Sequence, residues 1–197
     1  MGVKIIALTG PSGVGKDTFY ETVALGLAGE CNVLRISFSD ELRKMASEMF
    51  PWLPECDKPG WKDEPFVHQC NPNNLTPRDI WKRVATCARG VQDNVFGERL
   101  VKKMCEIISD RFPGPHDTLI VVTDLRSEPE FKLLKDLTKA FDIKFVRIDD
   151  CQTTVDNCQE IDKPTFNFEV DQTIINDKDE MSKQRFMDCA INFMGAF

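Results

Sequence analysis

The sequence predicts one α/β domain in three layers, in which helices cover both faces of a central, mainly parallel sheet. Two patterns favour this fold class. Near-continuous apolar runs of strand length, beginning with Val3–Thr9, recur along the chain, and such runs are typical of parallel strands buried on both faces. Segments with apolar residues at helical spacing alternate with these runs. At 197 residues the chain is long enough for one domain with a sizeable core.

Two strand–helix pairs are expected in the first 50 residues. The first strand is Val3–Thr9, and a glycine-rich turn separates it from a helical segment. The apolar residues that mark this helix are Phe19, Val23 and Leu27. A second strand is expected over 32–38, and Ser39-Asp40 is expected to cap a helix over about 41–50.

Prolines interrupt the chain between Pro51 and Pro77. This stretch also holds an Asn-Asn pair and three aromatic residues, Trp52, Trp61 and Phe66. A segment this long without regular structure inside a compact domain is usually a lid or a binding segment, and we favour that interpretation. The alternative is an ordered surface excursion that its tryptophans hold in place.

The rest of the chain continues the alternation of helices and strands. Helices are expected over about 78–90, 97–112, 128–140 and 178–194, and strands over 118–123, 143–148 and 172–175. Thr76-Pro77 precedes the first of these helices, and proline is common in the first helical turn. The segment 150–171 is expected to be irregular.

Charge and cysteine content argue against several classes of protein. The formal net charge of −7 disfavours a broad nucleic-acid or anionic-membrane surface, so any anion site must be a local cluster of Lys and Arg. No apolar run approaches the ~20 residues that span a bilayer, and we expect no signal peptide because Met1–Leu8 leads directly into the first strand. The eight cysteines contain no C-x-x-C pair, which favours reduced thiols in a cytoplasmic protein.

Neither histidine indicates a metal site or a catalytic base. His68 lies near Cys70 and Cys56, but the pattern lacks the paired spacing of zinc ligands. His116 lies in a Pro-Gly turn and has no partner that the sequence reveals.

A phosphate-binding loop is predicted after the first strand. Gly10, Gly15 and Lys16 have the spacing G-x-x-x-x-G-K. Glycines let successive N–H groups point at phosphate oxygens, and the helix that follows adds its positive N-terminal end. The lysine ammonium then reaches the outer phosphates of a nucleoside triphosphate. The residues expected to bind ATP are Pro11, Ser12, Gly13, Val14, Gly15, Lys16, Asp17 and Thr18.

Asp17 departs from the usual form of this loop. A Ser or Thr whose hydroxyl touches magnesium normally follows the lysine, whereas here Thr18 comes one place later. A carboxylate can hold Mg²⁺ directly or through water, so Asp17 is a candidate metal ligand. The alternative is an acid of the first helical turn that only complements the helix dipole.

Asp124 and Arg126 are candidate catalytic residues, together with Lys16. Asp124 ends a buried run, at the edge where open α/β sheets bind ligands, and an acid there can hold magnesium or its water shell. Arg126 leaves the same edge and can reach a transferring phosphoryl group. The alternatives are a simple turn acid for Asp124, and for Arg126 an exposed arginine paired with Glu128 or Glu130.

A second group of cations lies in the helix predicted over 78–90. Arg78, Lys82 and Thr86 are spaced four apart and share one helical face, and Arg83 and Arg89 are close by in sequence. They could bind the phosphate and the base of an acceptor together. A solvated charged face is the alternative.

Together these residues resemble the phage-type deoxynucleoside monophosphate kinase family, a branch of the P-loop kinases. The segments that carry the resemblance keep the family's order over nearly the whole chain. They are Gly10–Thr18, Phe38–Arg43, Thr76–Arg78, Val122–Glu130 with its D-x-R-x-x-x-E pattern, and Ile174–Asp177.

The resemblance implies a three-layer P-loop kinase fold in a single domain, with an acceptor-binding insertion at about 51–90 and a short lid at about 149–171. It implies that the γ-phosphoryl group of ATP passes, with Mg²⁺, to a deoxynucleoside monophosphate and gives the diphosphate. The reaction would take place in the cytoplasm, and in the cytoplasm of the host cell if the protein is phage-encoded. Asp17 and Asp124 would serve the metal. Contacts to the acceptor are expected from Phe38, Ser39, Asp40, Arg43, Arg78, Lys82, Thr86 and Arg89.

The chain departs from the family in two segments. The expected lid, 149–171, contains Lys163 but no arginine, whereas related kinases carry lid arginines that close over ATP. The helix over 78–90 has Lys82 and Ala85 where the family tends to have Gln and Gly. The sequence therefore leaves open which base is accepted, and whether the protein is a monomer or a homodimer.

Three other readings remain. A phosphomevalonate kinase-like enzyme shares the Gly-Lys-Asp loop, but its acceptor has no base to occupy the aromatic residues Phe38, Trp52 and Trp81. A switch that hydrolyses GTP would need a guanine-reading Asn-Lys-x-Asp, and the chain offers only Asn176–Asp179. A P-loop protein that binds nucleotide without catalysis is the third.

Overall fold

The structure is a computed structural model of the chain, and it describes residues 2–55, 60–111 and 117–195. Within these residues the strands are β1 (Val3–Thr9), β2 (Asn32–Ile36), β3 (Thr118–Leu125), β4 (Asp142–Asp149) and β5 (Gln172–Ile175). The α-helices are α1 (Lys16–Gly26), α2 (Phe38–Met49), α3 (Pro77–Val91), α4 (Val95–Arg111), α5 (Glu128–Leu137) and α6 (Glu180–Met194). Two 3₁₀ helices, η1 (Trp61–Asp63) and η2 (Glu160–Asn167), lie in the connections. None of the described helices is long and apolar enough to cross a membrane.

The strands form one sheet in the order β2-β3-β1-β4-β5. Every pairing in it is parallel. β1 lies in the centre between β3 and β4, so the carboxyl ends of these three strands meet at one edge. The all-parallel order confirms the predicted α/β fold class, and it brings the loop after β1 next to the residues that end β3.

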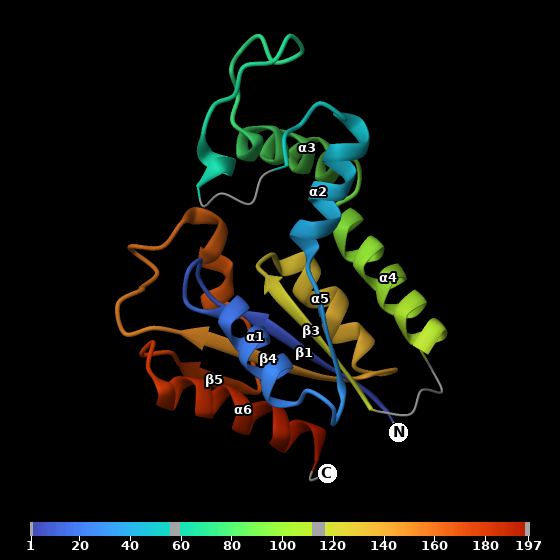
Figure 1. Cartoon of the computed structure of the whole chain (residues 1–197), viewed down its shortest axis with the longest axis vertical. Coiled ribbons are helices and arrows are strands. Elements are labelled where there is room, and N and C mark those ends of the chain that lie inside the picture. Colours follow the sequence, from blue (N-terminus) through green and yellow to red (C-terminus); the bar gives the residue numbers. More distant parts are fainter. Residues whose placement is uncertain (1, 56–59, 112–116, 196–197) are drawn as a thin grey trace.

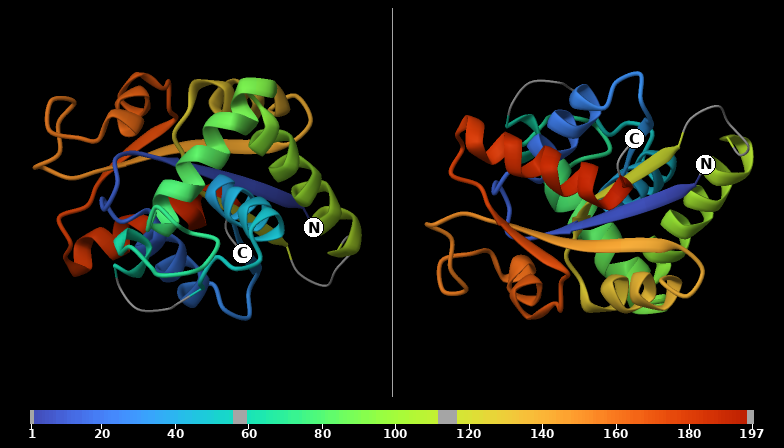
Figure 2. Two further views of the ribbon diagram at one scale, coloured as in Figure 1. Left: turned by 90° about the horizontal axis from the view of Figure 1, so that it is seen from above. Right: turned by 90° about the horizontal axis from the view of Figure 1, so that it is seen from below.

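Helices cover both faces of the sheet, as Figures 1 and 2 show. On one face α1 and α6 pack through Phe19, Val23, Phe186 and Ala190. On the other face the apolar side of α4, with α5, packs on the same strands; the residues that bury this face include Phe96, Leu100, Met104 and Leu134. The central strands are therefore apolar on both sides, which explains their continuous apolar runs.

A smaller lobe stands beyond the carboxyl edge of the sheet, at the top of Figure 1. It consists of α2, α3 and the excursion, which is defined here as the described residues 51–55 and 60–76. Trp81 and Ile80 of α3 pack with Ala46 of α2, and Trp52 and Trp61 of the excursion pack against them. This third apolar cluster is continuous with the core on the α4 face of the sheet, because Leu42 and Met45 of α2 pack against both.

The described part of the excursion is ordered by its own contacts. Asn71 is buried, and its side chain donates to the carbonyls of Phe66 and Leu75 and accepts from the Leu75 amide. Trp52 stacks on His68 at a centroid distance of 5.4 Å. The prolines thus break regular structure, as predicted, while a buried amide and aromatic contacts hold the chain in one path.

Several element boundaries differ from the predictions. The predicted cap Ser39-Asp40 of α2 is wrong, because Ser37 has an extended backbone and its Oγ accepts from the Asp40 amide at 3.2 Å. α5 ends at Leu137 rather than near 140. The segment expected to be irregular contains η2. Phe112, which was expected to end α4, and His116 and Cys56 lie outside the described residues.

Candidate active site

The loop between β1 and α1 has a backbone that glycine alone adopts readily. Gly10, Gly13 and Gly15 have φ values of 128°, 82° and 101°. A Cβ on Gly10 would lie 2.1 Å from the Ile148 carbonyl oxygen, and one on Gly15 would lie 2.1 Å from the Asn176 side-chain nitrogen. The glycines of the motif are therefore required by φ and by the close approach of β4 and of the turn after β5.

Asn176 supports the loop from the other end of the chain. Its side-chain nitrogen donates to the Val14 carbonyl at 2.8 Å, and its side-chain oxygen accepts from the Lys178 amide. Both partners hold the amide group in one orientation. In the structure Asn176 thus acts as a brace for the loop, and this use of its amide is unlike the base-reading role that a GTP-dependent switch would require.

Lys16 is the first residue of α1, and its side chain folds back over the loop. It is 5% exposed, and its Nζ donates to the carbonyls of Gly10 at 2.7 Å and Pro11 at 2.6 Å. Burial and, to a smaller extent, the nearby charge of Arg126 lower the pKa of Lys16 to about 8, while Asp162 opposes the shift. An anion placed beside this ammonium would reverse the shift.

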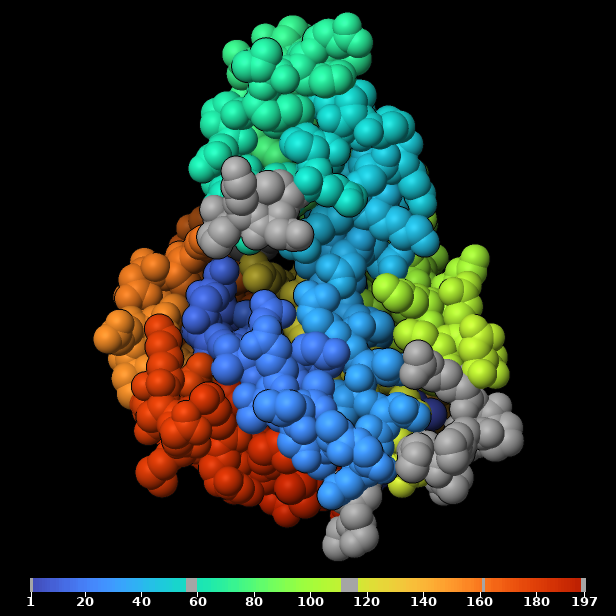
Figure 3. Space-filling model, viewed as in Figure 1, coloured from blue at the N-terminus to red at the C-terminus, as the bar shows by residue number. Residues whose placement is uncertain are grey.

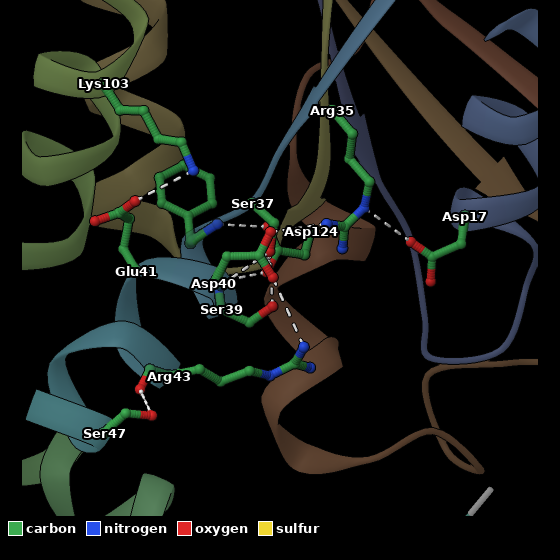
Figure 4. A network of polar contacts seen from close by, with 11 residues as sticks. Asp17, Arg35, Ser37, Ser39, Asp40, Glu41, Arg43, Ser47, Lys103 and Asp124 are labelled. Carbon is green, nitrogen blue, oxygen red and sulfur yellow. Dashed lines mark hydrogen bonds and ion pairs between the residues drawn. The ribbon is translucent and has the colours of Figure 1, made fainter. Parts of the chain in front are cut away.

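Asp17 and Arg35 form an exposed ion pair beside the loop (Figure 4). Arg35 Nε lies 3.5 Å from Asp17 Oδ1, and its Nη1 lies 2.7 Å from Asp40 Oδ2. The side chain of Asp17 is 74% exposed, so it is accessible to a ligand. Thr18, the residue after it, is also exposed. Asp40, which is predicted to contact the acceptor, pairs with Arg35 and also lies 3.7 Å from Nη1 of Arg43.

Asp124 joins the end of β3 to the start of α2. Its Oδ1 accepts from the Phe38 amide at 2.8 Å, and its Oδ2 accepts from the Ser39 amide at 2.8 Å and the Ser37 hydroxyl at 3.0 Å. These are the amides that a helix leaves unpaired at its N-terminus. Asp124 therefore positions the small lobe, and a metal would meet it chiefly through water because both oxygens already accept hydrogen bonds.

A cavity of about 660 Å³ lies between the loop, the small lobe and the lid segment, defined here as 149–171. In Figure 3 the lobe stands over the loop residues, which are coloured blue. The cavity gathers ten of the residues predicted for the site. They are Ser12, Phe38, Ser39, Arg43, Arg78, Lys82, Thr86, Arg89, Asp124 and Arg126. Of the other predicted residues, Pro11, Val14 and Lys16 are buried and Gly15 is half-buried, whereas Gly13, Asp17 and Thr18 are exposed. None of these residues, nor Asp40, is part of the cavity lining.

Acids from other elements pair with most of the arginines in the cavity. Asp63 of η1 holds Arg78 through both the Nε and the Nη2 atoms. Glu130, at the start of α5, accepts from Arg89 at 3.1 Å. Burial raises the pKa of Glu130. The guanidinium of each arginine is thereby directed before a substrate arrives.

Aromatic surface lies among these cations. Phe38, Trp81 and Phe96 line the cavity together with Leu42 and Ala85. The guanidinium of Arg43 lies 5.2 Å from the centre of the Trp81 ring, and that of Arg89 lies 5.2 Å from the Phe96 ring. The cavity can therefore hold a molecule with an anionic end and a flat apolar part.

Arg126 pairs with Asp162 of η2, and not with Glu128 or Glu130. Its Nη1 lies 3.3 Å from Asp162 Oδ1, and Asp162 Oδ2 accepts from the Ser12 amide at 2.9 Å. Sequence reasoning missed Asp162, because an acid in an acidic, irregular segment resembles any solvated surface acid. Glu130 was predicted only as a possible partner of Arg126 and as the last residue of the D-x-R-x-x-x-E pattern. Asp63, Arg35 and the bracing role of Asn176 were not predicted.

The residues present fit magnesium that arrives with a nucleotide. The described residues contain no group of three or more His, Cys, Asp or Glu side chains that could hold a metal ion on their own. Mg²⁺ usually binds through one or two carboxylates, several waters and substrate phosphates, and the exposed Asp17 beside the loop suits that mode. The same result leaves His68 and Cys70 without a zinc cluster among the described residues.

Comparison with known proteins yields the fold and no family. No family model matches the chain, and no curated protein matches its sequence. A candidate kinase from Chloroflexus aurantiacus has a similar structure, with a TM-score of 0.52 and 12% identity over 97% of this chain and 95% of that one. The likeness shows the fold alone, a parallel sheet with helices on both faces.

Two other solved structures are more distant. The Mycobacterium tuberculosis APS kinase CysC, in complex with AMPPNP and APS, has a TM-score of 0.47 and 15% identity over 97% of this chain and 96% of that one. A gluconokinase from Sinorhizobium meliloti has a TM-score of 0.39 and 13% identity over 97% and 91% of the two chains. At these scores neither structure bears on function.

Proposed function

We propose that this protein transfers the γ-phosphoryl group of ATP to a deoxynucleoside monophosphate and releases ADP and the nucleoside diphosphate. One observation carries the proposal. A single cavity joins the Ser12 end of the phosphate-binding loop to the cations of α3 and to three aromatic side chains. The loop would hold the donor, the cations would hold the acceptor phosphate, and the aromatic surface would accept its base.

The donor half rests on the loop and Lys16. Main-chain N–H groups in this geometry bind phosphates, and the buried ammonium of Lys16 can leave the carbonyls of Gly10 and Pro11 for the outer phosphates of ATP. Magnesium bound with ATP would neutralise part of the phosphate charge, with Asp17 as its protein ligand and Asp124 acting through water.

The acids that line the cavity favour a phosphate acceptor over a hydroxyl acceptor. Transfer to a hydroxyl needs a base, whereas the attacking oxygen of a phosphate is already ionised. Both oxygens of Asp124 accept from α2, Glu130 accepts from Arg89 and Ser127, and Glu128 pairs with Lys132 at 2.6 Å. These contacts commit Asp124 to the start of α2 and Glu130 to Arg89 and Ser127. Burial raises the pKa of Glu130, but the hydrogen bond from Ser127 and the charge of Arg89 oppose that rise and favour a carboxylate that holds the site.

In the proposed reaction an oxygen of the acceptor phosphate attacks the γ-phosphorus. The new P–O bond forms as the bond between the γ-phosphorus and the bridging oxygen of ADP breaks. Arg126, at the end of β3, would lie beside the transferring group, and its permanent charge would stabilise the charge on the equatorial oxygens. Arg43, Arg78 and Arg89 would hold the acceptor in line.

A panel of acceptors tests the proposal. Each deoxynucleoside monophosphate, and mevalonate 5-phosphate as a control, is incubated with ATP and Mg²⁺, and the diphosphate product is measured. We expect turnover of at least one nucleotide and none of the control. Turnover of mevalonate 5-phosphate alone would show that the nucleotide assignment is wrong.

Lys16→Ala provides the matched negative control. The substitution removes the ammonium but leaves the glycine backbone, so we expect turnover to fall by about 10³-fold or more with an unchanged circular dichroism spectrum. Retained turnover in this variant would place the donor site elsewhere.

A further inference from the structure

The lid segment is held by arginines of the core and contributes none of its own. Arg147 of β4 donates through Nη2 to the carbonyls of Thr165, Phe166 and Phe168, at 2.9, 3.2 and 2.8 Å. The Arg147 guanidinium thus fixes the main chain at the end of η2. Here an arginine of the sheet reaches the lid, whereas in a lid with its own arginines those side chains would reach toward the sheet.

Asp162 makes the second attachment of the lid, and it does so at the phosphate-binding loop. The residue is 1% exposed, and its two oxygens contact the Ser12 amide and the Arg126 guanidinium. Burying a carboxylate is costly unless it is paired and hydrogen-bonded. Both of its partners line the cavity, and both are groups of the kind that bind phosphate.

The contact between Arg126 and Asp162 leaves room for a second partner. It is a single ion pair at 3.3 Å between Nη1 and Oδ1, whereas a bidentate pair would use two parallel hydrogen bonds. Arg126 remains 29% exposed at the cavity while Asp162 is enclosed. The carboxylate therefore orients the guanidinium without covering it.

We propose that Asp162 is a positioning residue for phosphoryl transfer: it aims Arg126 into the cavity and ties both Arg126 and the Ser12 end of the loop to the lid. In this arrangement Arg126, rooted after β3, supplies the cation that an arginine-free lid lacks. The inference rests on the proposed phosphoryl transfer, but it is independent of which acceptor is used.

The test is Asp162→Asn, which keeps the size of the side chain and an oxygen for the Ser12 amide but removes the charge that orients Arg126. We expect kcat to fall about 10- to 100-fold, as for a misplaced catalytic group, with the KM for ATP within about threefold of wild type. Glu160→Gln is the matched control, because Glu160 lies in the same 3₁₀ helix and pairs only with the exposed Lys163 among the described residues. It should leave kcat unchanged.

A double-mutant cycle separates positioning from general support of the fold. Arg126→Gln should lower kcat by about 10²- to 10³-fold, and adding Asp162→Asn to it should cause no further loss, because the two residues act as one unit. Additive losses, or an equal loss in Glu160→Gln, would overturn the proposal. If Asp162→Asn does not fold, Asp162→Glu displaces the charge by one methylene and carries the same expectation for kcat.

Failure of this inference can be told apart from failure of the proposed function. Wild-type turnover that Asp162→Asn leaves unchanged would overturn the role of Asp162 alone. If no acceptor is found, the double-mutant cycle is measured with the rate of ATP hydrolysis by water, a slow reaction that uses the same γ-phosphoryl site. A wild-type protein that neither phosphorylates an acceptor nor hydrolyses ATP overturns both proposals.

Discussion

The two halves of the candidate site are built in different ways. The proposed donor half is mostly main chain: three glycines at positive φ and the N-terminus of α1, packed against β4 and Asn176, with the buried side chain of Lys16 added. The acceptor half is side chain: arginines of α2 and α3, each directed by an acid or an aromatic ring, around a cavity. We therefore expect the loop to tolerate few substitutions, because its backbone geometry requires glycine. The side chains of the acceptor half can be substituted one at a time.

The largest expected effect is in the donor half and compares two glycines of one loop. Gly10→Ala would place a Cβ 2.1 Å from the Ile148 carbonyl oxygen, while a Cβ at Gly13 would meet nothing within 4 Å. Both positions have positive φ. We expect Gly13→Ala to lower the free energy of unfolding by about 1–2 kcal/mol, and Gly10→Ala by about 2–5 kcal/mol because overpacking adds to the strain.

Urea titration of the two variants measures this difference. Equal losses of stability would show that the contact with β4 does not constrain the loop. In that case the main-chain account of the donor half would have to be abandoned.

The next effect belongs to the acceptor half. Arg78→Ala should raise the KM for the acceptor by about 10- to 100-fold, the value of a charge-assisted contact, and leave the Kd for ATP unchanged. Arg83→Ala is its control, because Arg83 is on the same helix and exposed but does not line the cavity. Steady-state kinetics and ATP titration check both values. An equal rise in the two variants would favour a solvated charged face.

The third prediction uses the pKa of Lys16, which burial and Arg126 lower to about 8. Bound phosphates would raise this pKa, so the complex would retain a proton that the free protein loses above pH 8. Affinity for ATP should therefore be greatest below pH 8 and weaken above it, by about tenfold per pH unit at most. Calorimetry in two buffers should detect proton uptake on binding at pH 9 and little at pH 7. Proton release at pH 9 would contradict this account.

The smallest effect concerns the acid that directs Arg78. Asp63→Asn removes the negative charge that directs Arg78 but keeps the arginine itself. The interaction is visible in the pKa of Asp63, which Arg78 lowers through their hydrogen bond. Since the pair is exposed, we expect the KM for the acceptor to rise by only about two- to fivefold. A rise as large as that for Arg78→Ala would mean that Asp63 itself contacts the acceptor.

Sequence reasoning succeeded where the signal is local. The glycine spacing of 10–16, the apolar runs of the strands and the helical spacing of α1 and α3 each depend on neighbouring residues, so they could be recognised before the fold was known. The cap of α2 failed for the complementary reason. Ser37, Ser39 and Asp40 are all good caps in isolation, and the choice among them depends on Asp124, which lies 84 or more residues away in the chain.

The sequence by itself determined the glycine-rich loop after β1, the parallel α/β fold and the identity of most cations near the cavity, because periodicity and glycine spacing are properties of short segments. Only the tertiary structure decided which acid meets which cation. Asp162 reaches Ser12 across 150 residues, and Glu130 reaches Arg89 across 41. Such pairings follow from the order of the strands and the path of the lid. They could not be predicted from the sequence, because a charged residue in an irregular segment carries no local sign of being buried.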